Sequence, residues 1–246
     1  MIKKILVLLC LSFTLQSVFA AENLYEKNYK AQNNGGLVSL QANPDSKMYV
    51  SNHKDDDNIS MLENGYDMMG SSGFEAGNVS AELALQHAKS IKADTVLVYS
   101  KYASKSSGVN KLQVIKEAAK TTGEVDASVL KQDDEQYKYY ASYWAKLPSP
   151  LLGVHVVKLV QAARPEDDDG KKREVEGLKI LAVIKGSPAD KAGLQKADTI
   201  KKIGEMSVNK SDDLFAAVKQ YQGKTVEIAY VRDEAAALTK ATLNSR

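Results

Sequence analysis

The first half of the chain alternates between two hydrophobic periods, one typical of strands and one typical of helices. Every-other-residue alternation of branched and aromatic side chains marks the strands, and a period near 3.6 residues marks the helices. Strands are expected at residues 47–51, 66–74, 94–102 and 137–146, and helices at residues 55–63 and from Ser80 onward. This order predicts a small α/β, sandwich-like domain whose sheet carries helices on one or both faces.

Polar or proline-containing segments precede, interrupt and follow the predicted strands and helices. Residues 21–46 are polar and are expected to form a flexible lead-in. Residues 103–136, rich in Ser, Lys, Gly, Asp and Gln, predict a long mobile hairpin insertion between two strands. The two prolines in Leu147-Pro148-Ser149-Pro150 predict a short, stiff joint. The expected domains are therefore residues 47–147 and 148–246.

The helix that begins near Ser80 has a hydrophobic side made of Leu83, Leu85, Ala88 and Ile91. The segment from Gly65 to Ser100, with Gly65-Tyr66, Gly70-Ser71-Ser72, Ala84, Ala88-Lys89 and the run from Ala93 to Ser100, resembles the front domain of a group of uncharacterised bacterial envelope proteins. That resemblance implies a fold and a compartment, and it implies no activity.

The C-terminal part shows a different pattern, in which short branched strands are separated by glycine turns. Its defining segments are Leu151-Leu152-Gly153-Val154-His155-Val156-Val157, Gly186-Ser187-Pro188-Ala189, Ala192-Gly193-Leu194, Asp198-Thr199-Ile200 and Gly223-Lys224-Thr225-Val226. Their order and spacing resemble the PDZ domains of bacterial HtrA-type envelope proteases, over residues 150–243. The resemblance implies a partly open β-barrel, capped by helices, that captures extended peptide ends by strand addition.

This resemblance also implies a peptide site between a loop-and-strand segment and a helix. The Leu-Leu-Gly-Val turn resembles a carboxylate-binding loop, and alternation places Leu152, Val154 and Val156 toward the pocket for the last peptide side chain. The helix is expected to be capped at Ser211-Asp212-Asp213 and to pack inward through Leu214, Val218 and Tyr221. The predicted peptide-binding residues are Leu151, Leu152, Gly153, Val154, His155, Val156, Phe215, Ala216 and Lys219.

One position departs from the PDZ pattern. The family often has Pro-Gly-Asp before its isoleucine, whereas this chain has Lys196-Ala197-Asp198, so another turn geometry is expected there. An alternative for the whole domain remains open, namely a packing or dimerisation module that binds no free C-terminus.

The N-terminus predicts export. Lys3 and Lys4 precede an apolar run, and Val18-Phe19-Ala20 has the small residues that a signal peptidase needs, so residues 1–20 are expected to be a signal peptide. Cys10, the one cysteine, would leave with it. Removing Lys3 and Lys4 from the 33 basic residues leaves 31, equal to the 31 acidic residues. A chain near neutrality favours neither nucleic acid nor an anionic membrane as partner, and no stable membrane anchor is expected.

Candidate chemistry in the front domain is weak. Gly70-Ser71-Ser72-Gly73 superficially resembles a serine-nucleophile turn, but an α/β domain of this size does not suit a double-barrel protease. The acids of His53-Lys54-Asp55-Asp56-Asp57 suit a helix N-terminus better than a metal. The aromatic run from Tyr137 to Trp144 suits a half-buried strand better than a sugar or base platform. We therefore expect no catalytic residues, no metal and no cofactor.

Two classes of function follow. The favoured one is a non-catalytic, exported adaptor or scaffold whose PDZ groove binds protein C-termini or extended peptides in the bacterial periplasm or outside the cell. The alternative is an enzyme or small-ligand receptor whose site lies in the front domain, with the PDZ domain as an accessory.

Overall fold

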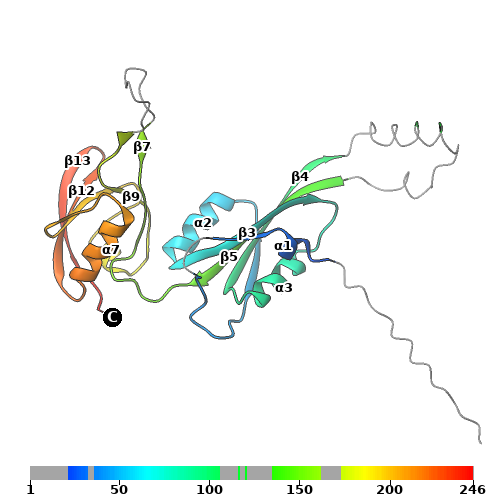
Figure 1. Cartoon of the computed structure of the whole chain (residues 1–246), viewed down its shortest axis with the longest axis horizontal. Coiled ribbons are helices and arrows are strands. Elements are labelled where there is room, and N and C mark those ends of the chain that lie inside the picture. The colour runs from blue at the N-terminus through cyan, green and yellow to red at the C-terminus, as the bar shows by residue number, and fades with distance from the viewer. Residues whose placement is uncertain are drawn as a thin grey trace, which may run out of the picture.

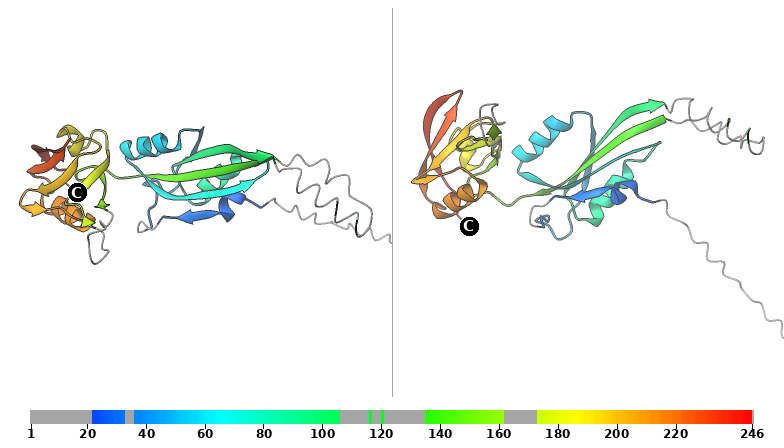
Figure 2. Two further views of the ribbon diagram at one scale, coloured as in Figure 1. Left: turned by 90° about the horizontal axis from the view of Figure 1, so that it is seen from above. Right: turned by 45° about the horizontal axis from the view of Figure 1, so that its top comes forward.

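The computed structural model describes residues 22–32, 36–105, 116, 120, 135–161 and 173–245. The expected signal peptide and most of the expected insertion lie outside this set. The described residues form two main sheets that share no strand, one of five strands and one of six. Figure 1 shows the two sheets side by side, joined through the end of β5, and Figure 2 shows the same arrangement from two other directions. We call them the front unit and the C-terminal unit.

The front unit is a mixed sheet in the order β1-β3-β5-β4-β2. Only β2 and β4 pair in parallel among its neighbouring strands, and the other pairs are antiparallel. The strands are β1 (Tyr29–Ala31), β2 (Lys47–Ser51), β3 (Tyr66–Ala76), β4 (Thr95–Lys105) and β5 (Glu135–Lys146). The helices are α1 (Leu24–Lys27), α2 (Lys54–Glu63) and α3 (Glu82–Ser90). The predicted α/β class is confirmed.

Helices cover both faces of this sheet. Successive residues of its central strands point to opposite faces, so each strand contributes side chains to both cores. On β4, Val96 and Val98 belong to the core that includes residues of α1 and α3. Leu97 and Tyr99 belong to a second core, against which Met61 and Leu62 of α2 pack. The aromatic residues of β5 divide in the same way, with Tyr139 and Tyr143 in the first core and Trp144 in the second.

The lead-in that we expected to be flexible is docked from residue 22 to residue 32. Asn23 caps α1, its side-chain oxygen accepting from the Tyr25 amide at 3.0 Å, and its amide group donates to the Leu83 carbonyl at 2.8 Å. The Tyr25 side chain is completely buried. After α1, β1 pairs with β3 as an edge strand. The prediction was wrong here because one buried aromatic residue outweighs the polar composition around it.

His87 lies on the buried side of α3, where we had expected only aliphatic residues. Its ring centroid lies 4.7 Å from that of Tyr29 and 5.1 Å from that of Tyr143, and its Nε2 has no hydrogen-bond partner. Burial lowers the pKa of His87 below its ordinary value of 6.5, and the Glu26 charge opposes this shift. The folded state therefore favours the neutral ring.

We expect the free energy of unfolding to fall as the pH drops below about 6.5, because the unfolded chain then binds a proton that folded His87 resists. The stability from this residue is present above that pH and is lost below it. Urea unfolding at several pH values should show a smaller decline for His87→Phe than for the wild type. The exposed His53→Gln is the control, and equal declines in the wild type and His87→Phe would contradict the prediction.

The C-terminal unit has the strand order β13-β12-β10-β9-β6, with β11 paired to β10 and a separate β7–β8 hairpin pair. Its strands are β6 (Val154–Val157), β7 (Val160–Gln161), β8 (Arg173–Glu174), β9 (Leu178–Val183), β10 (Thr199–Ile203), β11 (Met206–Ser207), β12 (Thr225–Arg232) and β13 (Ala235–Thr242). Two helices, α6 (Pro188–Lys191) and α7 (Ser211–Gln220), complete it. Its buried core includes Leu178, Ile180, Ile200 and Ile228.

The turn before β10 keeps the backbone geometry that a glycine would favour. Ala197 adopts a φ of 77°, so the different geometry expected from the absence of glycine is not found. Asp198, only 1% exposed, accepts from the Gln195 amide at 2.8 Å and from both Nε and Nη2 of Arg232 at 2.7 Å. These bonds satisfy a buried carboxylate and fix the turn.

Candidate functional site

A groove of about 260 Å³ opens between β6 and α7 in the C-terminal unit. Most of the side chains at its surface are apolar, which suits the burial of a hydrophobic side chain. Its lining residues are Leu147, Pro150, Leu151, Leu152, Gly153, Val154, His155, Ile184, Ser211, Leu214, Phe215 and Val218.

The loop at residues 151–153 is held by its carbonyl groups. The Leu151 carbonyl accepts from the Asn244 amide at 3.0 Å, and the Leu152 carbonyl accepts from the Ala189 amide at 2.9 Å. The Gly153 carbonyl accepts from the Ile184 amide at 2.9 Å. Within the described part of the chain, the amides of Leu152 and Gly153 donate to no protein acceptor. Two adjacent backbone donors are therefore available beside the groove, and such donors suit an anion.

Gly153 is required for this loop geometry. Its φ is 93°, in the left-handed region, and a Cβ at this position would overlap the side chain of Ser187. Ser187 is itself buried and caps α6, its Oγ accepting from the Asp190 amide at 3.3 Å. Glycine therefore allows the loop and the start of α6 to approach each other closely.

The β6 strand is at the edge of its sheet, where its only strand partner in the described sheet order is β9. A free edge of this kind can pair with an extended chain. The register of β6 with β9 shifts between His155 and Val156, where Leu181 of β9 is left unpaired, so the alternation along β6 itself continues. Val154 and Val156 both pack against the core, and Val154 and His155 line the groove, whereas Val156 is absent from the lining.

The α7 side of the groove differs from the prediction. Phe215 lines the groove and is 66% exposed, but Ala216 and Lys219 are exposed residues outside it. Leu214 and Val218, expected to pack only inward, contact the core and also line the groove. A one-residue rotation of the assumed helix face accounts for the difference.

The cap of α7 also differs. Lys210 is the N-cap residue, and the carboxylate of Asp213 accepts from the amides of Asn209 and Lys210 at 3.0 and 3.1 Å. Ser211, which we had expected to provide the cap, is the first helical residue and lines the groove. Its hydroxyl adds a polar group to an otherwise apolar wall.

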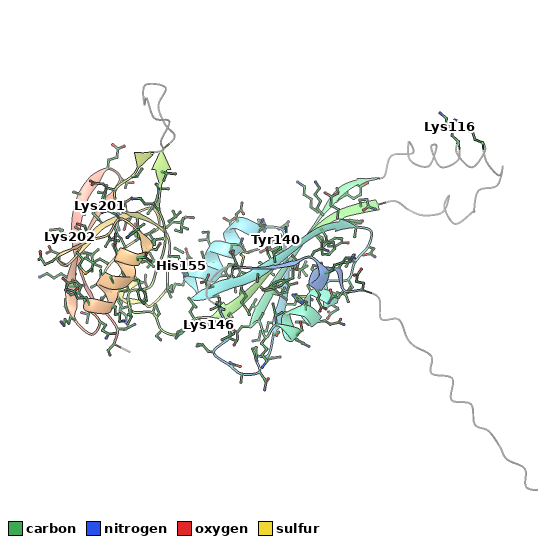
Figure 3. The ribbon with its side chains drawn as sticks, viewed as in Figure 1. Lys116, Tyr140, Lys146, His155, Lys201 and Lys202 are labelled. Atoms are coloured by element: carbon green, nitrogen blue, oxygen red, sulfur yellow. The ribbon has the colours of Figure 1, made fainter. Side chains whose placement is uncertain are left out.

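His155 is the titratable residue that borders the groove. Burial lowers the pKa of His155 below 6.5, while the charge of Asp67, in the front unit, opposes the shift. Its Nε2 is buried without a hydrogen-bond partner. Figure 3 shows His155 on the side of the C-terminal unit that faces the front unit. Burial therefore favours the neutral ring at this wall of the groove.

The other sequence candidates do not form a second site among the described residues. Ser72 is fully buried, and its hydroxyl donates to the Tyr25 carbonyl at 2.6 Å, so it lacks the exposure of a nucleophile. Asp57 accepts from the Tyr99 hydroxyl at 3.2 Å. No group of three or more described His, Cys, Asp or Glu residues could hold a metal ion. No described helix has the length and apolar character needed to cross a bilayer.

Residues 150–243 match the PDZ domain family, so the C-terminal unit is a PDZ domain. The chain is 31% identical over 102 residues to the serine protease Do-like HtrA of Lactococcus lactis subsp. cremoris (strain MG1363), covering 40% of this chain and 25% of that protein. It is 33% identical over 91 residues to the serine protease Do-like HtrA of Lactococcus lactis subsp. lactis (strain IL1403), covering 36% and 22%. The chain thus spans a quarter or less of the length of these relatives.

Solved structures of HtrA PDZ domains are also similar to this part. The HtrA3 PDZ domain bound to a phage-derived ligand, FGRWV, is 20% identical and covers 37% of this chain and 89% of its own, with a TM-score of 0.27. The HtrA-type protease AlgW with a decapeptide is 22% identical and covers 40% of this chain and 30% of its own, with a TM-score of 0.32. The predicted resemblance to HtrA-type PDZ domains is confirmed for the C-terminal part of the chain. The resemblance of the front unit stays a prediction.

Proposed function

We propose that this protein is a non-catalytic adaptor whose PDZ groove binds the C-terminal ends or extended segments of partner proteins. The observation that carries the proposal is the coincidence of three features at one place. These are an edge strand, two unused loop amides and an apolar groove between β6 and α7. An extended peptide would add to β6 through main-chain hydrogen bonds.

Each feature would meet a different part of the peptide. The amides of Leu152 and Gly153 would donate to the terminal carboxylate in charge-assisted bonds, which are stronger than neutral ones. The last side chain would enter among Leu152, Leu214 and Val218, where burial contributes about 25 cal/mol per Å². Ordering the peptide offsets much of this gain, so a dissociation constant on the order of micromolar is expected.

The expected signal peptide would place this binding in the bacterial envelope or outside the cell. Because residues 1–20 lie outside the described residues, export is part of the proposal. It is tested by the mass of the exported protein, which should begin at Ala21.

Two α7 variants test where the peptide binds. Phe215→Ala removes an exposed ring from the groove and should weaken binding of short peptides ending in Val, Leu or Phe by about threefold to tenfold. Lys219→Ala, four residues along the same helix and outside the groove, is the matched control and should leave the affinity unchanged. Fluorescence anisotropy with labelled peptides measures both. Equal losses of peptide affinity in the two variants, or a loss in Lys219→Ala alone, would contradict binding of the peptide in the groove.

A further inference from the structure

The C-terminal end of α2 is docked against the turn that follows β9. The Lys185 amide donates to the Glu63 carbonyl at 2.9 Å, and the Lys185 ammonium lies 3.7 Å from the Glu63 carboxylate. Gly65 lies beside Ile184, since a Cβ added to Gly65 would be 3.4 Å from Ile184 Cγ2. Figure 1 shows α2 as the helix of the front unit that faces the C-terminal unit. The two units therefore meet at residues 63–65 and 184–185.

The joint between the units is bound to the same place. The Leu147 amide donates to the Gly65 carbonyl at 2.9 Å, and the Lys146 ammonium donates to the Asn64 carbonyl. Lys146 Nζ also lies 4.7 Å from the centroid of the Tyr66 ring. Because Leu147 lines the groove, this set of bonds connects the front unit to one wall of the candidate site.

The turn at residues 184–187 also holds the carboxylate end of the groove. The Ile184 amide donates to the Gly153 carbonyl at 2.9 Å, and the Ser187 hydroxyl lies 3.4 Å from the same oxygen. Lys185, which contacts Glu63, lies between these two residues in the sequence. A continuous series of contacts thus runs from Glu63 through Lys185 and Ile184 to Gly153.

We propose that Glu63 and Lys185 are positioning residues for the groove, and that docking of the front unit strengthens the binding of a peptide carboxylate. This inference rests on the proposed function, because it assigns a role to the front unit in peptide binding. Docking fixes the 184–187 turn, and that turn fixes the Gly153 carbonyl and hence the loop amides. By linkage, a bound peptide must strengthen docking by the same factor.

Charge reversal tests the pair. Glu63→Lys and Lys185→Glu each place like charges at the contact and should weaken peptide affinity by about threefold. The double reversal restores an opposite pair and should return the affinity to within about twofold of the wild type, a rescue that a merely structural lesion would not show. Glu205→Lys is the matched control, because Glu205 forms an exposed ion pair with Lys202, 3.6 Å apart, away from the contact.

Reciprocity gives a second readout. In a Cys10→Ser background, Glu63→Cys/Lys185→Cys places a disulfide across the docked contact. A saturating peptide with a free carboxylate should raise the equilibrium constant for this cross-link in a glutathione buffer by about threefold, whereas its C-terminal amide should not.

The outcomes separate the two proposals. If the wild type binds peptides but the single reversals bind equally well, or the double reversal fails to restore affinity, the positioning role is overturned and the peptide site stands. An unchanged cross-linking constant overturns the positioning role in the same way. If the wild type binds no peptide in the anisotropy assay, both proposals are overturned.

Discussion

Replacing Tyr25 with alanine is expected to lower the free energy of unfolding of the front unit by about 3–5 kcal/mol, the usual loss when a large buried aromatic side chain is truncated. The ring of Tyr25 packs edge-on against Phe74, with centroids 4.9 Å apart, and lies 6.3 Å from Tyr139. The ring thus belongs to the core of the front unit, although the segment that carries it is mostly polar. Its loss would also free α1 and β1.

Tyr25→Phe is the matched control, because the Tyr25 hydroxyl is buried without a hydrogen-bond partner. Removing an unsatisfied hydroxyl relieves a desolvation cost of about 1–3 kcal/mol, so this variant should be as stable as the wild type or more stable. Denaturant unfolding followed by tyrosine and tryptophan fluorescence measures both variants. A loss below about 1 kcal/mol for Tyr25→Ala would mean that residues 22–32 are not docked.

Gly153→Val is expected to reduce peptide affinity at least tenfold, equivalent to about 1.4 kcal/mol. A branched side chain disfavours the φ of 93° at this position, and its Cβ would overlap Ser187. The loop must then move away from α6, which removes the two amides from their places beside the groove. Calorimetric titration with a peptide that ends in a free carboxylate measures the effect.

Gly193→Ala is the control for backbone strain. Gly193 also has a left-handed φ, 76°, but a Cβ there would meet no atom within 4 Å. This variant should lose some stability and keep the wild-type affinity. Retained affinity in Gly153→Val, with the fold intact by circular dichroism, would exclude the loop as the carboxylate site.

The front sheet was predictable because its strands have strong local signals. The run Val96-Leu97-Val98-Tyr99 is apolar on both faces, and the structure covers both faces with helices. The burial of Tyr25 could not be predicted from a hydrophobic period of this kind. A four-residue helix and a three-residue strand are too short to show a period, and their stability comes from tertiary packing.

In the candidate site, the sequence located the loop residues of the groove lining more closely than the helix residues. Gly153 stands in a motif whose backbone geometry requires glycine, so the sequence marks it directly. Phe215 lies in the groove lining, whereas Ala216 and Lys219 lie outside it, since helix periodicity locates a face only to within about one residue. Val156 packs against the same core as Val154 but is absent from the groove lining, because strand alternation does not indicate how far along β6 a groove extends.

The role of Asn244 was missed because it depends on contacts distant in the sequence. Its side-chain amide donates to the Pro150 carbonyl at 2.7 Å, and its backbone amide donates to the Leu151 carbonyl. Asn244 thus holds the carbonyl groups at the start of the loop in place. A polar residue after the last strand gives no indication of this role until the fold brings it beside the loop.

Calorimetric titration of the full chain with one peptide in two forms, free C-terminal acid and C-terminal amide, tests the central claim most directly. The acid form should bind with a dissociation constant on the order of micromolar, and the amide form should bind at least about tenfold more weakly. This difference arises because the amides of Leu152 and Gly153 would lose a charged acceptor. Equal affinities for the two forms would contradict carboxylate recognition by the loop at residues 151–153.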